Sequence, residues 1–434
     1  MTSMLRRLVG ALVCAVFCAL AAGCVGSADP NGPAGSGLQN SSHPSSAAGP
    51  QVRRRAEQRL LDQRAEAVRQ HDLARFLRTL DRSNARFVAR ERTYFANLEQ
   101  LPLARFGYRV STRSWPKLLG SPSWGRDVHV PRVQVLTQLA GFDAAPVRRV
   151  TGFAFRRVQG RLVIVSDRTG AGSPYPGSQP APWDLTRVHV RDRGNVLGIF
   201  DDRAWPRSLA VMSAVHAGIY DVARAVPYAW PDRAVVYGFY DHAVLASFDA
   251  VPGGNIDHLG ALTFPVYAVP GGPGVVSRRF TLLPASLRAG EPFLGQIVRH
   301  ELTHIAVGVH DDGLPVWLAE GVAEYVGARP LSTSERRIAT LAVSRAASGA
   351  GSMPASKTYN HDHQQWHYAL SWMAVDYIAA TRGEATVWRL VAALHAHGRG
   401  TSDANQDPVL LQVLGYDSHQ LARRAAARIL HIYG

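Results

Sequence analysis

Apolar residues recur at helical spacing early in the folded sequence and then change to the alternation typical of strands. Helices are predicted over residues 53–70, 72–80 and 83–98, and strands over 106–112, 128–139, 149–158 and 161–166. Gln159-Gly160 is a turn signal that joins the last two strands as a hairpin. Helices followed by an antiparallel sheet indicate an α+β layer for this region.

A second region begins after a stretch rich in Gly, Pro and Ser at residues 169–183, which we interpret as a linker. It opens with short strands, followed by a helix over 206–225, strands over 234–240, 262–269 and 278–283, and a mainly helical remainder. The predicted fold class is therefore α+β. N-terminal helices and an antiparallel sheet are followed by a small sheet and a mainly helical C-terminal lobe.

The N-terminus predicts an exported chain that carries a lipid. Two arginines precede an apolar run over 8–22 that has the length of a signal peptide and is short for a membrane span. The run ends in Leu-Ala-Ala-Gly-Cys, which resembles the lipidation box of bacterial lipoproteins and implies a lipid on Cys24. The other cysteines, Cys14 and Cys18, lie in the removed segment, so no disulfide framework is expected.

These features divide the chain into segments with different predicted roles. The tether after Cys24 is rich in Gly, Ser, Pro and Ala and has too few apolar residues to bury a core. The predicted segments are a signal peptide at 1–23, the lipidated cysteine and disordered tether at 24–51, an α+β accessory domain at 52–168, the linker at 169–183 and a catalytic-type domain at 184–434.

The net charge is strongly positive and is carried by arginine. The chain of 434 residues has a formal charge of +15, yet its only lysines are Lys117 and Lys357. The arginines are dispersed, without a basic run interleaved with aromatics and without a recognition-helix or zinc-finger pattern. We therefore expect no nucleic-acid partner, and we interpret the charge as solvated surface attracted to an anionic cell envelope.

The segment 300–304 reads His-Glu-Leu-Thr-His and has the clearest chemical meaning in the chain. The pattern H-E-x-x-H places two histidines four residues apart on one helix face, where both imidazoles can hold one metal ion. Glu301 then projects beside the metal, where it can act as general base on metal-bound water. Leu302 and Ile305 continue an apolar stripe, and Gly308 is a predicted helix stop.

A catalytic zinc site needs three protein ligands, so His300 and His304 require one more. The next predicted helix, over 315–325, offers two carboxylates on one face, Glu320 and Glu324, and either completes the set by residue type. His310, Asp311 and Asp312 are interpreted as ordinary polar residues of a loop. A second cluster comprises His361, His363 and His367; a His-rich tract can bind metal, but we favour the interpretation as ordinary polar residues.

The runs His-Glu-Leu-Thr-His and Trp-Leu-Ala-Glu-Gly-Val-Ala-Glu-Tyr together resemble the gluzincin metallopeptidases of the peptidase MA clan, over about residues 186–434. The resemblance implies Zn²⁺ on His300, His304 and Glu320, with Glu324 as the acid that orients a ligand histidine. Glu320 follows His304 at a shorter interval than in the large aminopeptidases. The N-terminal region is similar, in the order of its elements only, to a cystatin-like or nuclear-transport-factor-like cone.

The resemblance also implies a mechanism and a function. Glu301 would take a proton from zinc-bound water as that water attacks the scissile carbonyl. Tyr359 and Tyr368 are candidates for stabilising the oxyanion, and Tyr368 resembles the transition-state tyrosine that opens a downstream helix in aminopeptidase-like members. We expect a lipid-anchored zinc peptidase acting on peptides or proteins outside the cytoplasmic membrane. The alternatives are a non-catalytic zinc-binding scaffold lipoprotein and a zinc amidase for another envelope substrate.

The lipid anchor predicts that Cys24→Ser abolishes lipid attachment. The folded part should keep its activity, because a disordered tether has no contacts to lose. Metabolic labelling with a fatty-acid analogue, compared between the wild-type and Cys24→Ser chains, measures the effect. A wild-type chain that takes up no label would be an ordinary secreted protein.

Overall fold

The computed structural model describes residues 49–116, 120–247, 260–269, 271–397, 403 and 405–434. Cys24, the predicted signal peptide and most of the predicted tether lie outside these residues. Within the described ranges, no helix is long and apolar enough to cross a membrane. The fold class is α+β, as predicted from the sequence.

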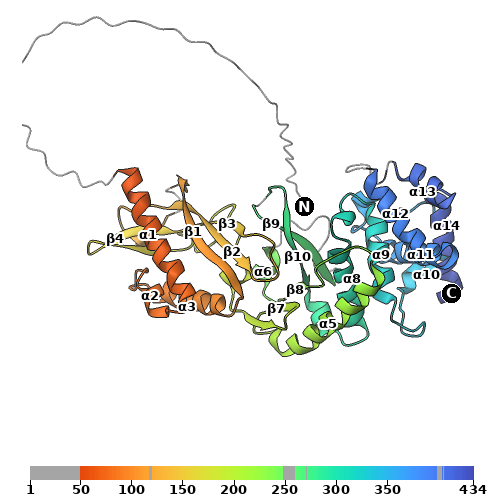
Figure 1. The fold of residues 1–434 in the computed structure, drawn as a ribbon, viewed down its shortest axis with the longest axis horizontal. Helices are drawn as coiled ribbons and strands as arrows, with labels where there is room; N and C mark the ends of the chain where they lie inside the picture. The colour runs from red at the N-terminus through yellow and green to blue at the C-terminus, as the bar shows by residue number, and fades with distance from the viewer. Residues whose placement is uncertain (1–48, 117–119, 248–259, 270, 398–402, 404) are drawn as a thin grey trace, which may run out of the picture. The chain divides into compact units, whose positions relative to one another are not determined.

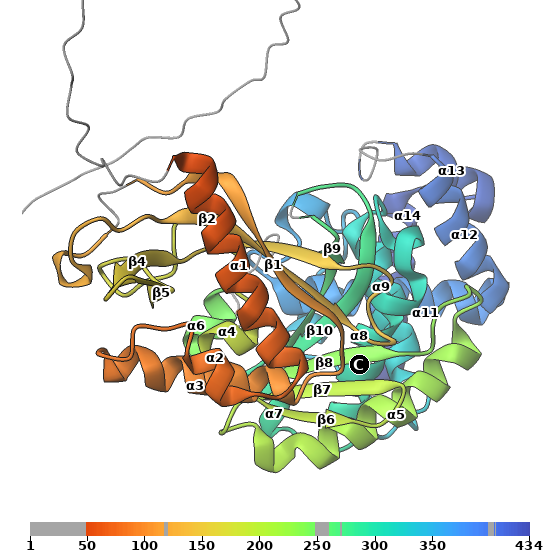
Figure 2. The same ribbon diagram turned by 60° about the vertical axis from the view of Figure 1, so that its left-hand side comes forward.

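The N-terminal region packs helices against an antiparallel sheet. Asp72 and Asn84 begin two of the helices, because each side chain accepts a hydrogen bond from the backbone N–H three residues later. In Figures 1 and 2 the first helix lies across the sheet. The elements are α1 (Pro50–Arg69), α2 (Leu73–Leu77) and α3 (Ala85–Glu99), and the sheet order is β1 (Leu103–Ser114), β2 (Pro131–Leu139), β3 (Val147–Gly152).

The single strand predicted over 149–158 is two strands in different sheets. β3 ends at Gly152, and β4 (Ala154–Val158) pairs with β5 (Arg161–Ser166). Residues 152–155 are buried in succession, so the in-and-out alternation of a single strand ends there and the chain changes sheet. The predicted hairpin turn at Gln159-Gly160 is present, with φ of 49° and 78°, as a type I′ turn requires.

The second sheet is mixed. Every residue of β7 and β8 is buried, which is typical of parallel strands that are covered on both faces. β7, β8 and β10 run parallel, whereas the edge strands β6 and β9 run antiparallel to their neighbours. The order of strands is β6 (His189–Asp192), β7 (Val196–Phe200), β8 (Ala234–Gly238), β10 (Val275–Leu282), β9 (Ala261–Tyr267).

The two faces of this sheet belong to different hydrophobic cores. Val196 and Val236 join a core formed with the C-terminal helices, which we call the lobe core. Leu197 and Val235 join residues of the N-terminal region, such as Phe76, in what we call the shared core. The N-terminal region therefore packs on one face of this sheet, and the C-terminal helices pack on the other. The described residues form one compact unit.

Helices enclose the lobe core. α8 packs against both α5 and α9, and α9 packs against α11. The longer helices are α5 (Ser208–Ala225), α8 (Phe293–Val307), α9 (Val316–Ala328), α10 (Thr340–Ala347), α11 (Gln364–Arg382), α12 (Glu384–Ala396), α13 (Gln406–Leu414) and α14 (Ser418–Tyr433). The short helices are α4 (Pro182–Leu185), α6 (His242–Ala246) and α7 (Pro284–Arg288).

Gly321 lies where α9 approaches α11 most closely, because a Cβ there would be 2.5 Å from the backbone oxygen of Ser371. Gly321→Ala should destabilise the protein by about 1–3 kcal/mol, since one helix must shift to make room. Chemical denaturation measures the change. Gly107→Ala is the control, because a Cβ there meets nothing within 4 Å. Equal stability of the two variants would show that the α9–α11 contact is not tight.

Candidate metal centre

Helix α8 brings both histidines of the sequence pattern onto one face. Its apolar face packs on α5, where a Cβ on Gly218 would lie only 2.8 Å from Leu302 Cδ1. The helix ends at Gly308, whose positive φ of 62° is a conformation that glycine adopts without strain. His300 and His304 are four residues apart and therefore project together toward α9.

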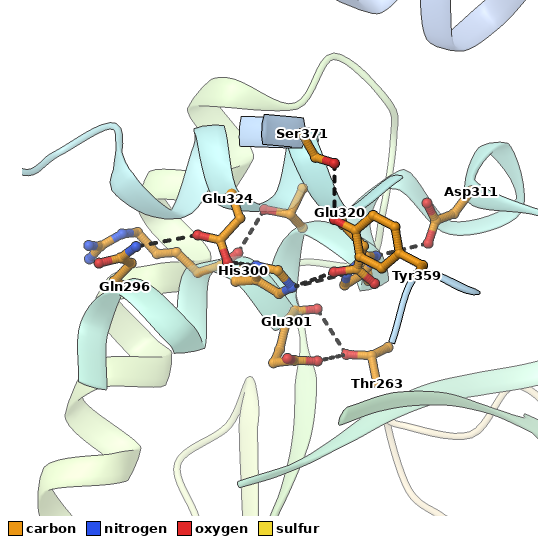
Figure 3. A network of polar contacts seen from close by, with 12 residues as sticks. Thr263, Gln296, His300, Glu301, Asp311, Glu320, Glu324, Tyr359 and Ser371 are labelled. Atoms are coloured by element: carbon orange, nitrogen blue, oxygen red, sulfur yellow. Dashed lines mark hydrogen bonds and ion pairs between the residues drawn. The ribbon is translucent and has the colours of Figure 1, made fainter. Parts of the chain in front are cut away.

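Three side chains converge between α8 and α9 (Figure 3). His300 Nε2 lies 3.3 Å from His304 Nε2, and these nitrogens lie 3.2 and 3.7 Å from Glu320 Oε2. The candidate ligand atoms of these residues all lie within 4.8 Å of one another. No other group of three such residues is found in the described part of the chain, and Glu324 is not a member of this one.

The outer nitrogen of each histidine faces a carboxylate. His304 Nδ1 lies 2.9 Å from Asp311 Oδ2, and His300 Nδ1 lies 3.4 Å from Glu324 Oε1. A carboxylate at Nδ1 stabilises the tautomer that is protonated there and leaves the lone pair on Nε2, as in a metal-ligating imidazole. Glu324 thus makes the contact expected of an acid that orients a ligand histidine.

The two Nε2 atoms and Glu320 Oε2 are suited to bind a cation. Without one, two imidazole lone pairs and a carboxylate oxygen would repel one another at these distances. Glu320 Oε2 is also buried, with no hydrogen-bond donor among the described residues. Two imidazole nitrogens and one carboxylate oxygen are a donor set of catalytic zinc sites, which keep a fourth position open. The residues present therefore fit a Zn²⁺ ion.

The carboxylates also set the charge state of the histidines. Burial alone would lower the pKa of His300, but its contacts with Glu320 and Glu324 outweigh burial and raise that pKa to about 10. The pKa of His304 is raised well above its usual value, because Asp311 and Glu320 outweigh burial. Burial would raise the pKa of Glu320, yet the histidines hold it below its usual range. The surroundings favour positive charge at this point, which protonated imidazoles or a bound cation would supply.

Glu301 lies beside the three converging side chains without being one of them. Its side chain is buried, and its Oε2 accepts a 2.7 Å hydrogen bond from the hydroxyl of Thr263 on β9. Burial raises the pKa of Glu301, although His300 and His304 oppose the effect. A carboxyl group with a raised pKa, held next to a metal position, is suited to take up and release a proton.

Two contacts at this site, those of Asp311 and Thr263, were not predicted from the sequence. The interpretation of Asp311 as a plain loop residue overlooks its contact with His304, which it reaches because the 3₁₀ turn η5 (Gly308–Asp311) folds back under the end of α8. The predicted helix end at Gly308 was the one signal in the sequence that could have indicated this contact. Thr263 reaches Glu301 from a strand 38 residues earlier, and no local pattern indicates such a contact.

The two candidate tyrosines differ in position. Tyr359 is 1% exposed, and its hydroxyl donates to Ser371 Oγ at 3.1 Å. Tyr368 lines the cleft beside His300, with ring centroids 6.4 Å apart. Tyr368 lies in the second turn of α11, which begins at Gln364, so it does not open the helix as expected. Burial raises the pKa of Tyr368 well above its usual value, so its hydroxyl keeps a proton to donate.

A cleft of about 590 Å³ lies beside these residues and is lined by α8, α11 and the start of β9. His361 and His363 of the second histidine cluster line the same cleft. His367 Nδ1 instead contacts the backbone oxygen of Tyr359. None of the three belongs to the converging group.

No model of a known family matches the chain, and no curated protein matches it. The resemblance to gluzincins therefore rests on the residues of α8 and α9 alone.

The contacts predict that the surrounding acids differ in their effect on metal affinity. Glu320→Ala should leave the protein without metal, because it removes a ligand. Glu324→Ala and Asp311→Ala should each weaken affinity by about 10–100-fold, because they remove only the partner of a ligand histidine. Metal content after dialysis measures the effect, with Asp312→Ala as the adjacent control. A Glu324→Ala protein that loses all metal while Glu320→Ala keeps it would reverse the two roles.

Proposed function

We propose that this protein is a zinc-dependent peptidase that acts outside the cytoplasmic membrane, held there by a lipid on Cys24. The observation that carries the proposal is the convergence of His300, His304 and Glu320 next to a buried Glu301, beside a cleft that His300 and Glu301 line. The lipid anchor rests on the sequence around Cys24 alone.

His300, His304 and Glu320 would hold the metal. Zinc bound there would lower the pKa of a water molecule toward ~7 and polarise a carbonyl group. The acids at the outer nitrogens, Glu324 and Asp311, keep both imidazoles in the tautomer and orientation that ligation needs.

Glu301 would act as the general base. It takes the proton of the attacking water and delivers it to the nitrogen that leaves as the peptide bond breaks. The raised pKa of Glu301 suits proton uptake from water, because the carboxylate binds the proton more strongly. The bound proton is then available for delivery to the leaving nitrogen. Thr263 holds one carboxylate oxygen of Glu301 and so limits the orientations available to that side chain.

The edge strand β9 supports a peptide as substrate. In the described part of the chain, β9 pairs only with β10, and residues at its start line the cleft. An unpaired strand edge presents backbone N–H and C=O groups that an extended peptide can bind by adding a strand. Thr263 lies on the same strand, so substrate binding and the position of Glu301 are linked through β9.

Tyr368 is the residue best located to stabilise negative charge on the carbonyl oxygen during attack. It lines the cleft with His300 and keeps its phenolic proton because burial raises its pKa. The hydroxyl of Tyr359, in contrast, is engaged with Ser371. A preorganised donor of this kind contributes to rate because it interacts with charge that develops only in the transition state.

Glu301→Gln should leave the metal bound and reduce turnover by several orders of magnitude, because the ligands remain while proton transfer is lost. Zinc content and hydrolysis of an unstructured protein such as casein measure the two effects. Glu335→Gln, at an exposed glutamate far along the chain, is the matched control. Hydrolysis at the wild-type rate by metal-loaded Glu301→Gln would exclude the mechanism.

The same assay separates the alternatives. A wild-type protein that binds zinc but cleaves no peptide and no other amide would be a scaffold. A protein that leaves casein intact but hydrolyses a non-peptide envelope amide, with loss of that activity in Glu301→Gln, would be an amidase.

A further inference from the structure

A second cavity lies in the N-terminal region. It measures about 70 Å³ and is lined by residues of α1, α3, β2 and β3, together with residues 174–180 of the predicted linker. Arg64 on α1 is completely buried there, whereas Arg90 on α3 is about one-third exposed at 32%. Arg64 therefore forms the inner end of the cavity, and Arg90 with the linker residues forms its rim.

Several guanidinium nitrogens at this cavity lack an acceptor. Arg64 Nη1, Arg90 Nε, and both Nε and Nη2 of Arg149 are buried without a hydrogen bond to any described residue. A buried donor without a partner costs about 1–3 kcal/mol, and more when it is charged. One nitrogen of each arginine forms an ion pair: Arg64 Nη2 with Glu91, Arg90 Nη2 with Asp167 and Arg149 Nη1 with Asp184.

The cavity also carries an excess of positive charge. Four arginines line it, the fourth being Arg168, against three acidic residues. Burial raises the pKa of Glu91 against the opposing effect of Arg64, which weakens the negative side further. Because Arg64 is shielded from water, a bound monoanion would balance the charge, and a small turn of a lining guanidinium would bring its unpaired N–H groups to that anion.

We propose that this cavity binds a carboxylate group. The two coplanar oxygens of a carboxylate match the paired N–H groups of a guanidinium, which is why arginine binds carboxylates in bidentate fashion. The volume of about 70 Å³ exceeds twice the ~30 Å³ that one water occupies and accommodates a carboxylate with one or two carbons. Val135 and Phe153 add apolar wall, which suits the carbon chain behind the charged group.

The carboxylate can belong to a free short-chain acid or to the C-terminal end of a peptide. Both present the same group to the arginines, and the body of a peptide would continue past residues 174–180. The cavity includes none of the residues at the candidate metal centre, so the inference goes beyond the proposed peptidase function and does not depend on it.

Thermal unfolding of the whole chain tests the proposal. The probes are sodium acetate as the free acid, N-acetylglycine as a peptide end, and N-acetylglycinamide as the uncharged form of that end. Each is added up to about 50 mM against sodium chloride of equal ionic strength, since a ligand that binds only the folded state raises the unfolding temperature. Repeating the measurement after chelation of metal removes any contribution from carboxylates at the metal centre.

Acetate or N-acetylglycine should raise the unfolding temperature, and N-acetylglycinamide should not. The acid that gives the larger rise identifies the source of the carboxylate. Two results would overturn the proposal. One is no rise with either acid, which would mean that water fills the cavity. The other is equal rises with N-acetylglycine and its amide.

Substitutions of the arginines test whether the carboxylate binds in this cavity. Arg149→Gln should weaken it roughly 10- to 100-fold, because a charged donor is lost. Arg149→Lys should recover only part of the affinity, since lysine keeps the charge without the paired N–H groups. Arg156→Gln is the matched control, because Arg156 pairs with Asp81 but does not line this cavity. If Arg149→Gln does not fold, Arg90→Gln at the rim gives the same readout, and unchanged affinity there would count against the site.

Discussion

The burial of two imidazoles among carboxylates is the interaction on which the rest of the candidate site depends. Glu320, Glu324 and Asp311 each lie within 4 Å of a histidine nitrogen, in surroundings where charges interact much more strongly than at the surface. Such an arrangement tolerates little movement, because a displaced partner leaves buried charge uncompensated. Two glycines of α9 help to hold it: a Cβ at Gly321 would meet the backbone of α11 at 2.5 Å, and one at Gly327 would meet the backbone of α8 at 2.9 Å. These two glycines thus allow α9 to approach α8 and α11 closely and so help to set the distance between its acids and the histidines.

The candidate metal centre and the cavity beside α1 and α3 have side chains of opposite predominant charge. At the candidate metal centre, Glu320, Glu324 and Asp311 surround two imidazoles, and a buried carboxylate oxygen has no donor among the described residues. At the cavity beside α1 and α3, arginines outnumber acids, and buried guanidinium nitrogens have no acceptor among them. Both are cases in which the described residues do not satisfy their own polar groups, which folded proteins generally do. A cation at the first and a carboxylate at the second are the proposals that supply the missing partners.

The sequence predicted the features that depend on residues close together in the chain. The spacing of His300 and His304, the stop at Gly308 and the turn at Gln159-Gly160 each depend on neighbouring residues, and each is present as predicted. The break after Gly152 was missed because strand propensity continues through it, while the change of sheet is imposed by which distant side chains cover each face. Thr263 was missed for a similar reason: its partner Glu301 lies on another element, and the contact exists only because α8 packs against β9. Residue type alone left Glu320 and Glu324 equivalent, since both project from one helix face, and the preference for Glu320 came from the resemblance of the surrounding residues.

The shared core has a consequence for how the chain can be divided. On the same strands, Leu197 and Val235 face the N-terminal region, whereas their neighbours Val196 and Val236 face the C-terminal helices. A fragment that begins at the predicted linker would expose the first of these faces to water. Such exposure would weaken the strands that also support the C-terminal helices. A shortened chain that keeps the candidate metal centre would therefore need a replacement for the apolar cover that the N-terminal region provides.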